Sequence, residues 1–273
     1  MANWDNLSSR GDVEDRRAFG PAAIGGGLGV TGVIIVIAFQ LLSGGNVNDV
    51  LSTLDSSQLA PERNYQAQDF EGQDSYEVFA STVLGSNNDL WSTVFSKSNK
   101  TYTPPKLVLF RGATPSACGG ASSDVGPHYC PLDATIYLDE TFFDELKTRF
   151  HAKGGDVAEA YVISHEVGHH IQNLLGNLSA ANDNETSVKT ELQADCFAGL
   201  WAYSIRDLNV FQPGEITEAI DAAGAVGDDR IQRATTGRVQ PETWTHGSSA
   251  ERVHWFTKGF ETGSVQQCDT FSK

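Results

Sequence analysis

Basic residues are scarce in this chain, which carries 19 Lys and Arg against 35 Asp and Glu. The formal net charge of −16 at pH 7 excludes a general electrostatic attraction to nucleic acid or to anionic lipid. The acidic residues are spread along the chain rather than collected in a tail, so they favour solubility and indicate no particular substrate. We therefore expect no nucleic-acid partner.

Cysteine is also rare, and the four copies include no Cys-x-x-Cys pair, which argues against a structural zinc site built from thiolates. Cys118 and Cys130 flank a loop-like stretch, CGGASSDVGPHYC, and Cys196 and Cys268 remain as a second possible pair. Four cysteines allow three connectivities, and the sequence does not choose between them. We expect disulfides, which are typical of an oxidising compartment.

Charged residues are absent from Ala18 to Leu42, in the run AFGPAAIGGGLGVTGVIIVIAFQLL. A helix needs about 20 apolar residues to span a bilayer, so this run predicts a transmembrane helix. The alternative is a cleaved signal peptide, but the run is long, starts late and is not followed by an Ala-x-Ala site. Arg10, Arg16 and Arg17 precede it, and no Lys or Arg follows until Arg63. The positive-inside rule then predicts a single-pass protein of the cell membrane, with a cytoplasmic N-terminus and an extracytoplasmic domain.

These features predict four parts: a cytoplasmic segment (1–17), a transmembrane helix (18–42), a polar linker (43–72) and one globular domain (73–273). Within the domain, apolar spacing predicts more helices than strands, so we expect an α+β fold that is mainly helical with a small β-sheet. The expected helices cover 73–84, 88–97, 139–150, 157–175, 188–208 and 250–260, and the expected strands cover 106–110 and 135–138.

The expected helix at 157–175 contains the stretch ISHEVGHH. Residues four apart lie on one face of a helix, so His165 and His169 can bind one metal ion through their imidazole nitrogens. Glu166 follows His165 directly, and this H-E-x-x-H arrangement supplies two ligands and a carboxylate that can act as general base. His170 points about 100° away from the ligand pair, which makes it a packing or supporting residue.

A catalytic zinc ion needs a third protein ligand. The metzincin pattern would place Gly at position 172 and His at position 175, but the chain has Gln172 and Leu175. The single Met of the chain is Met1, so a methionine turn below the metal is also excluded.

The stretch ELQAD in the next expected helix supplies Glu191 as third ligand and places Asp195 four residues further on the same face. Asp195 can accept a hydrogen bond from the far nitrogen of a ligating His and so fix the orientation of its ring. The alternative is that both carboxylates face solvent. The apolar stretch CFAGLWAY beside them argues for burial, and buried carboxylates need partners.

His246 lies in a Thr-His-Gly-Ser turn, just before a helix opened by a capping box of Ser248 and Glu251. Such a turn can present a side chain to a cleft, where His246 would stabilise the negative charge of a tetrahedral intermediate. The alternative, a loop histidine bonded to local backbone, stays open. His128, His151 and His254 are expected to be ordinary surface or packing residues.

Six stretches of the chain resemble the membrane-anchored, neutral zinc metallopeptidase-like proteins of bacteria. They are VEDRR, GPHYCPLDATIYLDETFF, HEVGHHIQ, ELQADCFAGLWA, GDDRIQ and THGSSAERVHWFTKGF. The resemblance covers nearly the whole chain. It implies a zincin-like domain and peptidase activity, and it implies no particular substrate.

The predicted function is that of a zinc endopeptidase acting on protein or peptide, with Zn²⁺ held by His165, His169 and Glu191 and with Glu166 as general base. The strand at 135–138 is expected to pair with an extended substrate. Two alternatives remain: an envelope scaffold or adaptor whose zinc serves folding only, and a zinc amidase that acts on cell-wall material. A base beside the metal argues against the scaffold.

Overall fold

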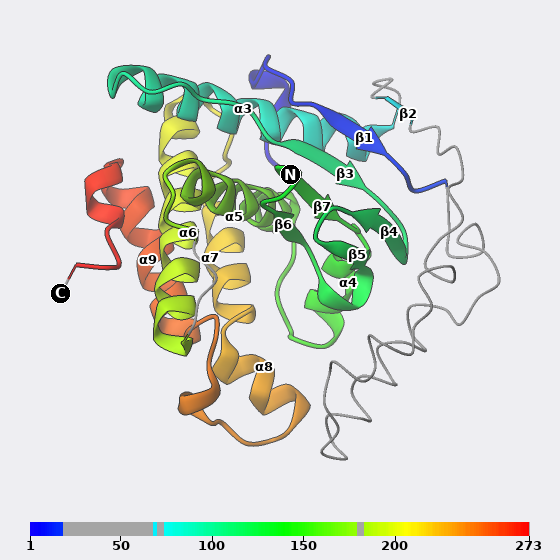
Figure 1. Ribbon diagram of the computed structural model, residues 1–273, viewed down its shortest axis with the longest axis vertical. Helices are drawn as coiled ribbons and strands as arrows, with labels where there is room; N and C mark the ends of the chain where they lie inside the picture. The colour runs from blue at the N-terminus through cyan, green and yellow to red at the C-terminus, as the bar shows by residue number, and fades with distance from the viewer. Residues whose placement is uncertain (19–67, 70–73, 179–182, 273) are drawn as a thin grey trace.

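The computed structural model describes residues 1–18, 68–69, 74–178 and 183–272 (Figure 1). These residues form an α+β fold in which long helices pack together on one side and a small mixed sheet lies on the other. The predicted combination of a mainly helical fold with a small sheet agrees with this arrangement.

The main sheet has five short strands in the order β2-β1-β3-β7-β6. The three central strands β1, β3 and β7 run parallel, and both edge strands run antiparallel to their neighbours. The prediction that the strand at 135–138 pairs with an extended substrate is wrong, because β7 lies between β3 and β6 and has no open edge. The strands are β1 (Val13–Asp15), β2 (Gln68–Asp69), β3 (Lys106–Leu109), β6 (His128–Cys130) and β7 (Thr135–Leu138).

A separate hairpin of β4 (Ala113–Ser116) and β5 (Gly119–Ser122) leaves the sheet after β3. A disulfide between Cys118 and Cys130 ties the turn of this hairpin to the edge strand β6. The second disulfide joins Cys196 to Cys268. The structure therefore contains the expected disulfides and gives the connectivity that the sequence left open.

The helices are α3 (Ser75–Lys97), α4 (Phe142–Thr148), α5 (Asp156–Leu174), α6 (Asn184–Ile205), α7 (Ile216–Ala225), α8 (Asp228–Thr235) and α9 (Ser249–Thr262). One continuous helix, α3, replaces the two predicted at 73–84 and 88–97. The interruption in the apolar pattern lies at Gly85, where a Cβ would collide with the backbone of Arg10 in the N-terminal segment that crosses the helix. The capping box predicted at the start of α9 is present between Ser248 and Glu251.

Helix α5 lies at the centre of the helical layer and is buried along most of its length between α3, α6, α7 and the sheet. Helices α6 and α9 pack backbone to backbone at two glycines. A Cβ on Gly199 would overlap the carbonyl oxygen of Phe256, and a Cβ on Gly259 would overlap the carbonyl oxygen of Cys196. These contacts fix α9 closely against α6.

The N-terminal segment belongs to the same domain. Strand β1 pairs with β3 over Val13–Asp15, and the Trp4 ring packs against Phe79, Trp201 and Phe211. At the end of the segment, Arg17 forms ion pairs with carboxylates that include Asp74. Residues 1–17 therefore pack as part of the domain rather than as a separate segment, and their cytoplasmic location stays a prediction.

The predicted transmembrane helix at 18–42 requires a correction. Nearly all of that segment and most of the predicted linker lie in residues 19–67, outside the described residues. Among the residues that the structure does describe, no helix is long and apolar enough to cross a bilayer. In addition, β1 before the segment and β3 after it are neighbours in one sheet. A single crossing between them would put these strands on opposite sides of a membrane, so the predicted single-pass anchor is wrong.

Candidate metal centre

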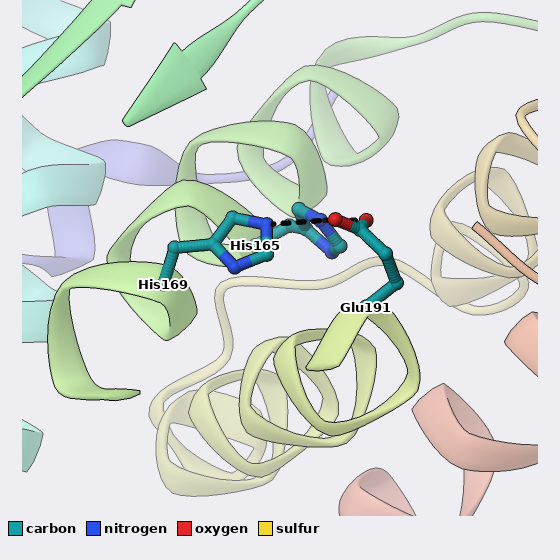
Figure 2. A group of neighbouring side chains, drawn as sticks. All are labelled: His165, His169 and Glu191. Carbon is teal, nitrogen blue, oxygen red and sulfur yellow. Dashed lines mark hydrogen bonds and ion pairs between the residues drawn. The ribbon is translucent and has the colours of Figure 1, made fainter. Parts of the chain in front are cut away.

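Two neighbouring helices bring the predicted ligands together (Figure 2). His165 and His169 lie one turn apart on α5, with their ring centroids 4.8 Å apart and their planes perpendicular, and Glu191 reaches them from α6. The Glu191 carboxylate lies 3.2 Å from His165 Nε2 through Oε2 and 3.4 Å from His169 Nε2 through Oε1. One ligand atom from each of the three residues lies within 4.8 Å of the other two.

The three residues fit a metal ion by the chemistry of their donor atoms. Two imidazole nitrogens and one carboxylate oxygen are the ligand set of several catalytic zinc sites. Burial opposes the charged form of His165, but Asp195 and Glu191 raise the pKa of its ring to about 10. Burial likewise opposes ionisation of Glu191, yet His169 and His165 hold the pKa of its carboxyl well below the usual range. Glu191 is therefore ionised in this cluster, and a divalent cation would take the place of the proton on His165 as its counter-charge.

Glu166 lies next to this group and is 6% exposed. Its Oε2 atom is buried and has no hydrogen-bond partner among the residues that the structure describes. A buried carboxylate oxygen without a partner is costly in a site with no function. Glu166 also lines the same cavity as the three candidate ligands, where a base would need to be.

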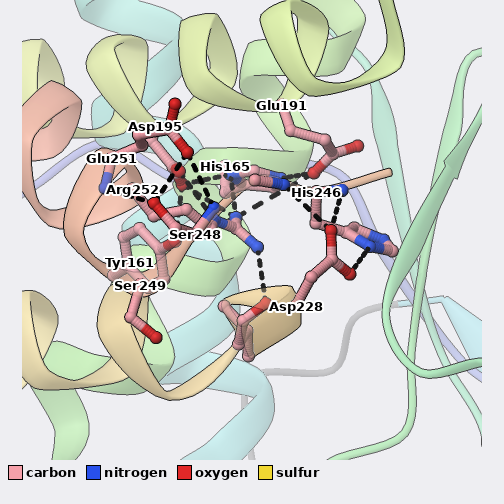
Figure 3. Close-up of polar contacts among 12 residues, drawn as sticks. Tyr161, His165, Glu191, Asp195, Asp228, His246, Ser248, Ser249, Glu251 and Arg252 are labelled. Carbon is pink, nitrogen blue, oxygen red and sulfur yellow. Dashed lines mark hydrogen bonds and ion pairs between the residues drawn. The ribbon is translucent and has the colours of Figure 1, made fainter. Parts of the chain in front are cut away.

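Asp195 lies where the sequence places it, behind His165 (Figure 3). Its Oδ1 is 2.9 Å from His165 Nδ1, and it accepts a hydrogen bond of 2.6 Å from the Tyr161 hydroxyl. Asp195 is fully buried, and Arg252 donates to both of its oxygens. A carboxylate on the far nitrogen of a ligating His fixes the ring and its tautomer, which leaves Nε2 for a metal.

His169 has a different partner on its far nitrogen. Nδ1 of His169 lies 2.9 Å from Gln172 Oε1, and the amide nitrogen of Gln172 donates to the backbone oxygen of Thr190 at 2.7 Å. Gln172 therefore links α5 to α6 directly beside the metal centre. A metzincin would have Gly at this position. The link between the two helices gives the long amide side chain of Gln172 a structural role here.

His246 combines features of both interpretations left open by the sequence. Its Nδ1 is 3.2 Å from Asp228 Oδ1, and Oδ2 of Asp228 accepts hydrogen bonds from the backbone nitrogens of Thr245, His246 and Gly247. The hydrogen bond to Asp228 raises the pKa of His246. The side chain is 49% exposed and lines the same cavity as Glu191. Local bonding thus holds the turn in place while the ring faces the cavity.

The remaining histidines stay apart from the three ligands. His170 Nδ1 lies 3.0 Å from the Tyr129 hydroxyl and Nε2 lies 2.7 Å from the backbone oxygen of Thr103, so its role is packing, as its direction on the helix predicts. His128 stacks on Tyr137 at one rim of the cavity.

The cavity beside the candidate ligands has a volume of about 620 Å³. Its lining combines polar groups of α5 and α6 with an apolar group and with residues around β6, which form the β6 rim. The apolar group contains Phe142, Leu146, Phe150 and Val162, and the β6 rim contains Gly126, Pro127, His128 and Tyr129.

Sequence reasoning missed four residues of the site: Tyr161, Gln172, Asp228 and Arg252. Asp228 lies in the stretch GDDRIQ, and Arg252 follows the capping-box Glu in THGSSAERV. The available signal for Arg252 was its place in a helix whose apolar face contacts α6, because an arginine on such a face needs a buried acidic partner.

In this α+β domain, two His and one Glu from adjacent helices can hold a metal ion, and a second Glu lies beside the first His. This arrangement is that of a candidate metallohydrolase. The chain belongs to the family described as "Putative neutral zinc metallopeptidase", whose model matches residues 2–271.

Two relatives align with all or most of this chain. YpfJ of Escherichia coli (strain K12) is 41% identical over 286 residues, which covers 99% of each chain. Rv2575 of Mycobacterium tuberculosis (strain H37Rv) is 46% identical over 216 residues, which covers 74% of this chain and 73% of the relative. Their names assign no activity, and no solved structure gives a significant match.

Proposed function

We propose that this protein is a zinc-dependent endopeptidase. The observation that carries the proposal is the convergence of His165, His169 and Glu191 on one point, with ligand atoms within 4.8 Å of one another. The family to which the chain belongs supports zinc as the metal. When bound, Zn²⁺ would lower the pKa of a water molecule toward about 7 and polarise the scissile carbonyl.

Glu166 serves as general base. It takes a proton from the water that attacks the scissile carbonyl and passes that proton to the leaving amine. Its position supports this role, because it follows His165 directly, lines the cavity and has a buried oxygen that no described residue satisfies.

His246 serves as a donor to the negative charge that develops on the carbonyl oxygen. Asp228 occupies Nδ1 of the ring, so Nε2 is the nitrogen available to a substrate. The same carboxylate favours the protonated imidazole, since the hydrogen bond from His246 raises the pKa of the ring. A protonated donor is the form that stabilises an oxyanion.

The substrate binds as an extended segment. Strand β6 is an edge of the five-stranded sheet and contributes its residues to the rim of the cavity, so its outer side can add a peptide strand. A cavity of about 620 Å³ accommodates a few side chains rather than a folded domain. The two disulfides support an oxidising compartment as the place where the enzyme works.

The test compares the full chain with its Glu166→Gln variant and a control, Glu261→Gln, which alters an exposed carboxylate on α9. Metal analysis of all three is expected to give one zinc per chain. Hydrolysis of an unfolded protein is expected to fall at least about 100-fold in Glu166→Gln and to be unchanged in Glu261→Gln.

Three outcomes would contradict the proposal. A wild-type chain that binds no zinc would remove the site. No difference in hydrolysis between wild type and Glu166→Gln would exclude Glu166 as the general base, and if neither protein cleaves substrate, a scaffold whose metal serves folding is favoured instead. Release of fragments from cell-wall material without cleavage of any protein would make the enzyme an amidase.

A further inference from the structure

Arg252 is a buried charge that the proposed reaction does not use. It lies on α9, a helix that supplies no metal ligand, and it is only 3% exposed. Removing an arginine from water costs several kcal/mol unless it is paired with an acid in good geometry. The partner is Asp195: Nε of Arg252 donates to Oδ2 at 2.7 Å, and one terminal nitrogen donates to Oδ1 at 2.9 Å.

The same terminal nitrogen of Arg252 reaches further into the metal centre (Figure 3). It lies 3.2 Å from the Tyr161 hydroxyl, 3.3 Å from His165 Nδ1 and 3.9 Å from Glu191 Oε2. The guanidinium group therefore touches the carboxylate that holds His165 and lies within ion-pair distance of the third ligand. The two bonds to Asp195 use the planar fork of the guanidinium group, which a lysine ammonium does not have.

The helix that carries Arg252 is held rigidly. The backbone contacts at Gly199 and Gly259 press α9 onto α6, and the Cys196–Cys268 disulfide joins the residue after Asp195 to the turn that follows α9. Another terminal nitrogen of Arg252 donates to the backbone oxygen of Val226 at 3.2 Å. The position of the guanidinium group is thus fixed by the packing of α6 and α9 rather than by the metal ligands.

We propose that Arg252 is a positioning residue that sets the metal affinity of the centre from α9. Arg252 holds Asp195 in place, and Asp195 in turn fixes the ring of His165 so that Nε2 points toward His169 and Glu191. The inference rests on the proposed zinc site and extends it to a helix with no ligand. The docking of α9 on α6 is thereby coupled to zinc binding.

The test is a double-mutant cycle on the full chain, with zinc affinity measured by competition against a chromophoric chelator. The variants are Arg252→Met, Asp195→Asn and the double variant, with Arg206→Met, an exposed arginine at the end of α6, as the matched control. Each single variant is expected to bind zinc about 10- to 100-fold more weakly. The double variant is expected to be no weaker than Asp195→Asn alone, because Arg252 acts through Asp195.

A cobalt-substituted sample separates positioning from general destabilisation. The visible spectrum of bound cobalt reports the arrangement of the ligands, and it is expected to change in Arg252→Met and not in Arg206→Met. Arg252→Lys keeps the charge without the fork, so its zinc affinity is expected to stay at least about fivefold below that of wild type.

Zinc affinity within twofold of wild type in Arg252→Met would overturn the inference, and so would losses that multiply in the double variant. If Arg252→Met does not fold, Tyr161→Phe removes a single bond to the same oxygen of Asp195. This variant measures how far the hold on Asp195 affects zinc affinity, with an expected loss of about three- to tenfold. Arg252→Lys then decides the inference, because zinc affinity equal to that of wild type in that variant would refute it. Failure of the wild type to bind zinc would instead overturn the proposed function itself.

Discussion

Glu159, on the first turns of α5, allows the burial of a carboxylate to be tested by pH. Burial raises its pKa from 4.5 to about 7. The folded state therefore holds a proton on Glu159 at pH values where the unfolded chain has lost it. The stability that this provides is fully present below about pH 4.5 and is lost as the pH rises through 7. A Glu159→Gln variant keeps a neutral side chain at every pH, so it is expected to gain stability over wild type as the pH rises.

The size of the effect follows from the shift. From 4.5 to about 7 is 2.5 pKa units, which corresponds to about 3.4 kcal/mol at most, and the side chain is only partly buried. With solvent screening, we expect the stability difference between Glu159→Gln and wild type to grow by about 1–2 kcal/mol between pH 5 and pH 8.

Urea unfolding at pH 5, 6, 7 and 8 measures this difference for each protein. Glu261→Gln serves as control, since its carboxylate is exposed and its variant is expected to track wild type at all four values. A difference between Glu159→Gln and wild type that stays constant from pH 5 to pH 8 would refute the reasoning, because it would mean that Glu159 ionises alike in the folded and unfolded chains.

Asp228→Asn is expected to reduce the turnover rate about 10- to 1,000-fold, because His246 loses the carboxylate that orients it, while the zinc content stays unchanged. Peptide hydrolysis measures the rate and metal analysis measures the zinc; loss of zinc from the variant would contradict this prediction. Gly259→Ala is expected to lower the unfolding free energy by about 1–3 kcal/mol in urea melts, because the added Cβ overlaps the backbone of α6. Removing the Cys196–Cys268 disulfide, which spans 72 residues, is expected to lower the unfolding free energy by about 4 kcal/mol. Removing Cys118–Cys130, which spans 12 residues, is expected to lower it by about 3 kcal/mol, and the reverse order would argue against loop entropy as the cause. Chelation is expected to lower the melting temperature and added zinc to restore it, as measured by calorimetry.

The sequence predicts the local part of the metal centre well. His165 and His169 share a helix face because of helical spacing, and the buried character of the α6 segment places Glu191 and Asp195 toward them. Arg252 could not be predicted in the same way, because it is 57 residues from Asp195 and its contact depends on how α9 packs against α6. Asp228 likewise meets His246 only through a turn that local patterns do not specify.

The sheet shows the same limit of sequence reasoning. Strand β7 was predicted from its apolar run, but its place inside the sheet depends on β6 and β3, and a strand of three or four residues carries too little pattern to be assigned. The uncharged run after Arg17 predicts an anchor because hydropathy is a property of one segment. The pairing of β1 with β3 is a contact between segments more than 90 residues apart, and it excludes a single crossing.

The ion pair of 2.9 Å between Arg17 and Asp74 has a practical consequence for protein engineering. The antiparallel pairing of β1 with β2 likewise places Asp15 opposite Gln68, so a short glycine-serine bridge could replace the 49 positions from 19 to 67 while β2 is kept. Fragments that begin near residue 70 would instead remove β1 and leave one side of β3 unpaired. A shortened chain for crystallisation should therefore keep its first 17 residues.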